Sequence, residues 1–219
     1  MEKYKHPGIG FIWYLILSIP IITYFTEYSN SSLTTCCFIA FGLRLTIYYL
    51  SKKSAEYSIE RTAAELTNAN GTKELEKIVQ EVMKESNTLK LYLLRMIISK
   101  IEHSTIIPSP IKEPIANGRP CYYTCPITII KKKKDKDNND YYDLSNGKDG
   151  KLYIFNNNVE WFEGDAHRAL PIKNILKMNL DCSGEILSAV RRNEGSPIHL
   201  HTPNAIIIMG IVEQIQNGK

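Results

Sequence analysis

The amino-acid sequence predicts an α+β protein with an N-terminal two-helix hairpin, a helical connector and a β-rich C-terminal domain that ends in one helix. Three features predict it: two long apolar stretches, then apolar residues at helical spacing, then short strand-like segments separated by turn residues. The 219 residues leave room for one ordinary domain beyond the hairpin. We expect the hairpin over 1–51, the connector over 52–104, a linker over 105–120 and the β domain over 121–219.

The two apolar stretches predict a transmembrane hairpin. Residues 7–26 carry no charge, and residues 33–50 carry one, Arg44. Each stretch is close to the roughly 20 residues that a helix needs to cross the hydrocarbon core. The loop between them has no Lys or Arg, whereas lysines flank the pair at Lys3, Lys5, Lys52 and Lys53. By the positive-inside rule we expect an integral membrane protein with both termini in the cytoplasm and the lipid bilayer as a partner.

Two other interpretations of the first stretch are a cleaved signal peptide and a buried helix. No small-x-small cleavage pattern follows the stretch, and bulky residues follow Pro20. A buried helix does not account for two such stretches in tandem, bracketed by lysines. Both observations favour the hairpin.

Composition and motifs narrow the class of function. The net charge of +4 suits an anionic lipid surface better than a nucleic acid, so we expect no nucleic-acid partner. Five scattered cysteines are not a disulfide framework. The sequence has no G-x-S-x-G, H-E-x-x-H, P-loop or G-x-G-x-x-G motif. We therefore expect no catalytic residues and no cofactor.

Cysteines and histidines give two weak metal candidates. Cys121 and Cys125 are separated by three residues, and no second pair lies nearby, whereas structural zinc takes four ligands. His199 and His201 alternate on a predicted strand and would share one face, with His167 as a third candidate. Surface or core histidines are commoner, so we expect no metal site.

The connector is predicted to be helical. Residues 51–66 continue from the second apolar stretch, residues 68–71 break the pattern, and a long helix is expected from Thr72 to about His103. Its second half is apolar nearly all round, which fits a helix on the bilayer surface or, better, one packed on a domain or partner. For an unknown protein partner or a second copy, the predicted contact residues are Leu89, Leu93, Ile97 and Ile101.

Beyond a proline-bearing linker the sequence predicts strands. Asn146-Gly147 and Asp149-Gly150 are typical turn dipeptides. The chain then ends in an amphipathic helix over 204–216. Strands are expected over 127–130, 141–144, 151–155, 159–163, 169–172, 175–180, 185–191 and 197–201.

The order of short strands followed by one helix resembles the GRAM/PH-like family, and so do the sequences of residues 150–164 and 167–175. Residues 150–164 read Gly-Lys-Leu-Tyr-Ile-Phe-Asn-Asn-Asn-Val-Glu-Trp-Phe-Glu-Gly, similar to that family's glycine, hairpin and turn, and 167–175 resemble its following strand. Phe155 stands where a threonine is usual, and Val159 where an arginine-leucine pair is typical. The resemblance implies a PH-like antiparallel β-barrel capped by a helix. Such domains bind lipid headgroups or proteins, or self-assemble, and have no general catalytic activity.

A run of four lysines gives the candidate ligand site. The run lies at the end of the first predicted strand. In the PH-like family that the chain resembles, the phosphoinositide-binding members carry basic residues at this place. An anionic lipid headgroup is the predicted ligand of Lys131, Lys132, Lys133 and Lys134. Asp135, Asp137, Asp140 and Asp143 follow closely and would cancel much of the field, so a solvated hairpin is the alternative.

Together these features predict a membrane-anchored, cytoplasm-facing binding or scaffolding module. The hairpin would tether the PH-like domain at the bilayer for lipid or protein interaction. Two alternatives stay open: a subunit of a membrane enzyme whose active site forms with a partner, and a subunit of a channel or transporter. Arg44 is the one hint of the last, since an arginine at a bilayer centre costs roughly 2.5–3.5 kcal/mol.

Overall fold

The computed structural model describes residues 31–104, 106, 108–111, 113, 115, 117–192 and 195–218, with backbone only for 31–40 and 109–110. The chain divides into two compact units, Met1–Thr62 and Ala63–Lys219. The first predicted membrane stretch, residues 7–26, lies outside the described residues.

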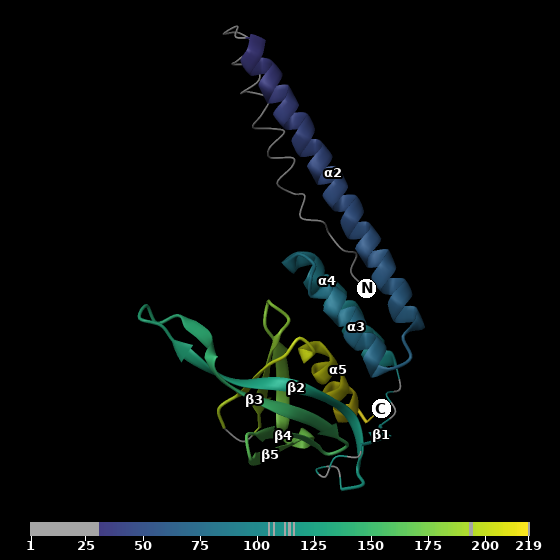
Figure 1. Cartoon of the computed structure of the whole chain (residues 1–219), viewed down its shortest axis with the longest axis vertical. Coiled ribbons are helices and arrows are strands. Elements are labelled where there is room, and N and C mark those ends of the chain that lie inside the picture. The colour runs from purple at the N-terminus through teal and green to yellow at the C-terminus, as the bar shows by residue number, and fades with distance from the viewer. Residues whose placement is uncertain are drawn as a thin grey trace. The chain divides into compact units, whose positions relative to one another are not determined.

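The first unit contains most of one long helix, α2 (Ser31–Asn68), which spans 38 residues (Figure 1). It joins the second predicted membrane stretch to the start of the predicted connector. A charged part begins at Lys52, whose Nζ lies 4.0 Å from a carboxylate oxygen of Glu56. The length of α2 is therefore not matched by an equal length of apolar surface.

Among the described residues, no helix combines the length and the apolar character that crossing a bilayer requires. This finding overturns two predictions. The transmembrane hairpin is wrong as part of the fold class, and the integral-membrane location with both termini in the cytoplasm is not supported. The physical reason is that α2 does not stay apolar, because beyond residue 50 the helix continues into a charged segment that includes Lys52, Lys53 and Glu56.

The single helix predicted over 72–103 is two helices, α3 (Thr72–Val82) and α4 (Asn87–His103). The chain leaves the helical conformation at Ser86, whose φ of −62° and ψ of 149° are extended. The break allows each helix to bury its own apolar side chains. In α3 these are Leu75, Ile78, Val79 and Val82.

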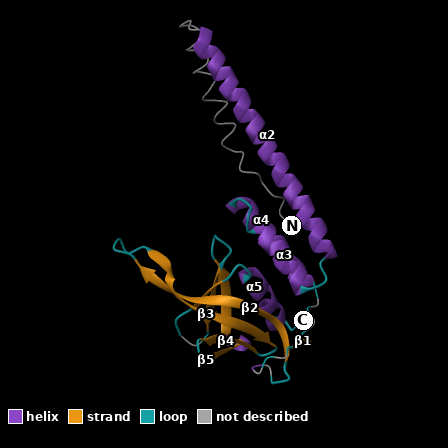
Figure 2. Ribbon diagram, in the orientation of Figure 1, coloured by secondary structure: helices purple, strands orange, loops and turns teal. Residues whose placement is uncertain are grey.

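The rest of the second unit is an antiparallel sheet and a C-terminal helix (Figure 2). Within the described residues the strand order is β5-β4-β3-β2-β8-β7-β6, and β1 pairs with the start of β2. The α+β class and the antiparallel sheet are therefore as predicted. The strands are β1 (Ser109–Pro110), β2 (Pro120–Lys134), β3 (Asp140–Phe155), β4 (Asn158–Glu163), β5 (Ala166–Pro171), β6 (Ile175–Leu180), β7 (Ile186–Arg191) and β8 (Ile198–His201).

The sheet is a meander in which the long strand β2 pairs with both β3 and the last strand, β8. The outer strands β5 and β6 follow each other in sequence but are joined by a 3-10 turn, η2 (Ile172–Asn174). In the described part of the chain the strand order ends at β5 on one side and β6 on the other, so the sheet stays open there.

Two predicted turns are wrong, because Asn146-Gly147 and Asp149-Gly150 lie inside β3. A Cβ atom on Gly150 would lie 2.1 Å from the Phe162 carbonyl oxygen, and one on Gly147 would lie 2.4 Å from Cγ2 of Thr128. The glycines therefore serve close packing against neighbouring strands. The turn between β2 and β3 lies in the charged run 135–139 instead.

The core is centred on α5 (Ala205–Gln216), which packs against both the sheet and α4 (Figure 2). Ile206, Ile207, Ile208 and Ile211 are fully buried, because the helix is covered on both sides. Gly210 allows the close approach of α4, since a Cβ atom there would lie 2.8 Å from Cγ2 of Ile101.

Candidate functional site

The four predicted lysines lie on an arm, defined as residues 131–143, where the paired ends of β2 and β3 project from the sheet (Figure 1). All four side chains are exposed. Lys132 Nζ lies 2.7 Å from Oδ2 of Asp140, and Lys133 Nζ lies 2.5 Å from Oδ2 of Asp143. The arm holds five lysines and four aspartates, so its net charge is close to +1.

Asp143 is the anchored carboxylate of the arm. It is 7% exposed and accepts hydrogen bonds from Ser145 Oγ and Asn146 Nδ2, each at 2.8 Å. The bond from Lys133, followed by these two, holds the pKa of Asp143 far below its usual range. The pairing across the ladder therefore neutralises much of the basic run.

The predicted partner-binding residues lie inside the second unit. Leu89 is 4% exposed, and Leu93, Ile97 and Ile101 are fully buried where α4 packs against α5. Gln214 on α5 also donates from Nε2 to the Ile101 carbonyl oxygen at 3.3 Å. In this structure the stripe contacts its own domain, and the role in partner binding stays a prediction.

A second charged region, missed by the sequence analysis, lies on the face of β3 and β4 that carries Tyr153 and Glu160. The described residues between β1 and β2, which are 111, 113, 115 and 117–119 and are here called the strap, lie on this face. Its apolar side chains Ile111 and Ile115 pack on a small cluster separate from α5. The cluster consists of Cys121, Tyr153 and Phe155, with Phe162 beside it.

An arginine of the strap forms a two-pronged ion pair with a buried glutamate. Arg119 Nη1 donates to Oε1 of Glu160 at 2.7 Å, and Nη2 donates to Oε2 at 3.0 Å. The glutamate side chain is 3% exposed. His167 Nε2 lies 3.1 Å from Oε2, and Asn158 Nδ2 donates to Oε1 at 3.4 Å. The guanidinium also lies 4.0 Å from the centroid of the Phe155 ring.

These contacts explain the electrostatics of Glu160. The Arg119 guanidinium is the largest influence and lowers the pKa of Glu160 from its usual range, although burial acts in the opposite direction. The carboxylate is therefore ionised although it is almost fully buried, and a buried carboxylate requires a cation nearby. The strap supplies that cation.

A second polar contact holds the strap at Glu113. Lys151 Nζ donates to Oε1 of Glu113 at 2.5 Å, and the Tyr153 hydroxyl donates to Oε2. The bond from Lys151 is the largest cause of the lowered pKa of Glu113, and burial raises the pKa of Tyr153. The strap is therefore complementary to the face at two positions: its Glu113 meets Lys151 and Tyr153, and its Arg119 meets Glu160.

A signal for Glu160 exists in the sequence. In a strand, alternate residues share a face, so Glu160 goes with Asn158 and Phe162, opposite Val159 and Trp161. An acid placed among apolar residues in this way needs a cationic partner. The sequence does not say that this partner is Arg119, 41 residues earlier.

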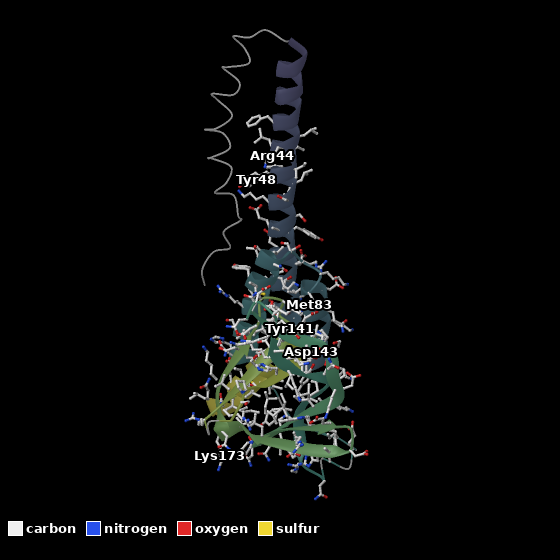
Figure 3. All side chains as sticks on the ribbon, turned by 90° about the vertical axis from the view of Figure 1, so that its left-hand side faces the viewer. Arg44, Tyr48, Met83, Tyr141, Asp143 and Lys173 are labelled. Carbon is white, nitrogen blue, oxygen red and sulfur yellow. The ribbon has the colours of Figure 1, made fainter. Side chains whose placement is uncertain are left out.

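A hollow of about 1010 Å³ lies at the open end of the sheet, next to η2. Lys173 of this turn lies at the opposite end of the unit from Met83 (Figure 3). Within the described residues the lining has two cations and no acidic side chain. It consists of Asn156, Asn157, Asn158, Pro171, Ile172, Lys173, Leu176, Arg192, Ile215, Gln216 and Asn217.

Three hydrogen-bonded ties fix the walls of the hollow. The backbone amide of Ile172 donates to the carbonyl oxygen of Asn157 at 2.8 Å. The backbone amide of Arg192 donates to the carbonyl oxygen of Asn174 at 2.8 Å. Gln216 Nε2 on α5 donates to the Ile175 carbonyl oxygen at 2.9 Å. The β3–β4 turn, η2, β6 and the end of α5 are therefore held together around one space.

The predicted metal candidates lie in different surroundings. His199 Nδ1 is 2.7 Å from Ser188 Oγ, whereas His201 Nε2 is 3.7 Å from a carboxylate oxygen of Glu185. Burial lowers the pKa of His199 and raises that of Cys125 to about 12. Within the described part of the chain, no group of histidine, cysteine or acidic side chains fits a metal ion.

No protein-family model matches the chain, and no curated protein matches it significantly.

Proposed function

We propose that the second unit is a PH-like binding module, and that its ligand is an acidic polypeptide segment bound in the hollow. The observation that carries this proposal is the hollow itself, with its two cations among amide side chains. The meander of strands, with β2 next to β8 and one helix after the last strand, supports the PH-like assignment. The resemblance of residues 150–164 to that family supports it further.

The chemistry of the lining favours a polypeptide. The side-chain amides of Asn156, Asn157 and Asn217 can donate and accept hydrogen bonds, as a peptide backbone requires. Leu176, which is 59% exposed on β6, offers an apolar contact. A volume of about 1010 Å³ accommodates several residues of an extended chain.

The charge of the lining favours an acidic segment. Lys173 and Arg192 both line the hollow, and a positive lining attracts and orients carboxylates. The lysines of the arm are a weaker basis for a ligand, because Lys132 and Lys133 already pair with aspartates. We therefore place ligand recognition in the hollow and not on the arm.

The test uses the full chain and a short labelled peptide of alternating glutamate and alanine, followed by fluorescence anisotropy. The double substitution Lys173→Glu and Arg192→Glu should weaken binding by roughly tenfold or more, because two attractive contacts become repulsive. The double substitution Lys134→Glu and Lys177→Glu is the matched control, since both lysines are exposed and neither lines the hollow. Equal binding of a lysine–alanine peptide, or unchanged affinity in the double variant, would refute the proposal.

A further inference from the structure

We propose that the face of β3 and β4 beneath the strap is a second recognition surface, which the strap occupies in cis. Its partner is a segment of another protein with the strap's chemistry: two apolar side chains flanking an acid, followed by an arginine. This inference is independent of the hollow and of its acidic ligand. It depends on the contacts between the strap and the face.

The strap lies between two paired strands, β1 and β2. At its base Ser109 pairs with Cys121 and Pro110 pairs with Pro120. At its far end Asn117 and Gly118 have φ angles of 44° and 76°, in the left-handed region, and turn the chain back toward β2. Because the base is closed by β1 and β2, the loop can leave the face without breaking the pairing of β3 with β4.

The contacts of the strap are those of a bound peptide. Ile111 and Ile115 pack on an aromatic surface, Glu113 accepts from Lys151 and Tyr153, and Arg119 forks onto Glu160. Each type of side chain on the strap thus meets a complementary group. A competing segment needs the same spacing of apolar, acidic and guanidinium groups to replace all of these contacts.

The buried charge gives the face its selectivity. Glu160 is 3% exposed and is held by a two-pronged arginine contact, whose geometry a lysine cannot reproduce. A face that serves packing alone gains nothing from a buried carboxylate, because an apolar residue avoids the cost of desolvation. With the strap away, Glu160 keeps His167 Nε2 at 3.1 Å but loses both guanidinium contacts, so the face favours an occupant that brings an arginine.

The test adds a labelled peptide with the sequence of residues 109–120 to the full chain. Wild-type protein should bind it weakly, because its own strap fills the face. Arg119→Ala, which releases the strap, should bind it at least tenfold more tightly, with faster hydrogen exchange of the amides of 117–119. Adding Glu160→Gln to Arg119→Ala should abolish the gain, and a peptide with alanine for Glu113 and Arg119 should not bind.

Several results would overturn the inference. These are equal binding by wild type and Arg119→Ala, unchanged exchange of the strap in that variant, or a gain that persists with Glu160→Gln. Hydrogen exchange in the paired parts of β2 and β3 reports whether the variant is folded. If Arg119→Ala unfolds, Arg119→Lys takes its place under the same criteria. The Lys173→Glu and Arg192→Glu substitutions should leave this binding unchanged, which separates the two proposals.

Discussion

The arm and the strap-covered face both hold carboxylates opposite basic side chains, but they differ in burial. On the arm, Lys132 and Asp140 are 42% and 48% exposed and lie 2.7 Å apart. On the face, Glu160 is 3% exposed, and its partner Arg119 comes from a separate loop. An exposed pair competes with water and salt and contributes little, whereas a buried carboxylate depends on its partner.

This difference shows that the charge pattern most visible in the sequence is not the one on which the structure depends most. Four consecutive lysines are conspicuous in the sequence, yet two of them pair with aspartates across a two-stranded ladder. A single glutamate between apolar neighbours is inconspicuous, yet it fixes a loop to the sheet through Arg119. Burial, and not the number of charges, decides which of the two regions responds to substitution.

The largest effect is expected for Arg119→Ala. It removes the guanidinium from a carboxylate that is 3% exposed in the wild-type fold, which should cost about 2–3 kcal/mol, below the roughly 3–5 kcal/mol of a fully buried pair because Arg119 is 43% exposed. Thermal unfolding should show a melting temperature lower by roughly 5–10 °C. Arg119→Lys should lose about half as much, since the charge stays but the fork is lost. Equal stability of Arg119→Ala and wild type would show that the ion pair does not hold the strap.

The next effect is a dependence on pH that Glu160→Gln should remove. The folded protein has a lowered pKa at Glu160, so the ionised group stabilises the fold above the unfolded value of about 4.3, and this contribution is lost as the pH falls through the folded pKa. The gap in melting temperature between wild type and Glu160→Gln should be full at neutral pH and shrink in acid. Asp165→Asn, at an exposed position in the β4–β5 turn, is the control. A gap that stays constant into acid would contradict the prediction.

A smaller effect is expected when the acids of the arm are removed. Replacing Asp135, Asp137 and Asp140 with asparagine should raise binding to vesicles rich in phosphatidylserine by roughly tenfold, because each unmasked cation adds up to about 1 kcal/mol near an anionic surface. Co-sedimentation at low and physiological salt measures this. The same number of exposed acids removed elsewhere, at Glu74, Glu81 and Asp165, gives a control of equal net charge. A gain as large in the control would mean that the arm has no special role.

The smallest effects concern single lysines of the arm. Lys133→Ala should lower the melting temperature slightly, because Asp143 is only 7% exposed and loses one of its donors. Lys132→Ala should leave it within experimental error, since both partners of that pair are exposed. Differential scanning calorimetry of the two variants side by side makes the comparison. A larger effect of Lys132→Ala would reverse the ranking by burial.

Local patterns predicted the strands of the second unit well. Alternation and turn residues located the strands over 159–163 and 175–180 and the C-terminal helix, and the structure confirms them as β4, β6 and α5. The same reasoning failed at Gly147 and Gly150. A glycine serves a turn or a close contact, and only the neighbouring strand, with the Phe162 carbonyl oxygen 2.1 Å from a Cβ on Gly150, tells which.

Hydropathy was a poorer guide to the helices. The apolar half of α4 was predicted to pack on a domain or a partner, and Leu93 and Ile97 are buried where α4 packs against α5, whereas partner binding stays a prediction. An apolar stripe on a helix indicates that this surface is buried, but it does not identify the element or partner that buries it. Likewise, the apolar stretch that suggested a membrane span continues into the charged end of α2, and no described helix meets the requirement for crossing a bilayer.

The sequence by itself determined the α+β class, the strand-rich C-terminal domain and its last helix, because these follow from the period of apolar residues along the chain. Only the tertiary structure decided that Arg119 meets Glu160, that η2 borders a hollow and that the lysines of the arm face aspartates. Such pairings join residues far apart in the chain, and their strength depends on burial. Local sequence patterns predict neither which distant residues lie close together in space nor how deeply they are buried.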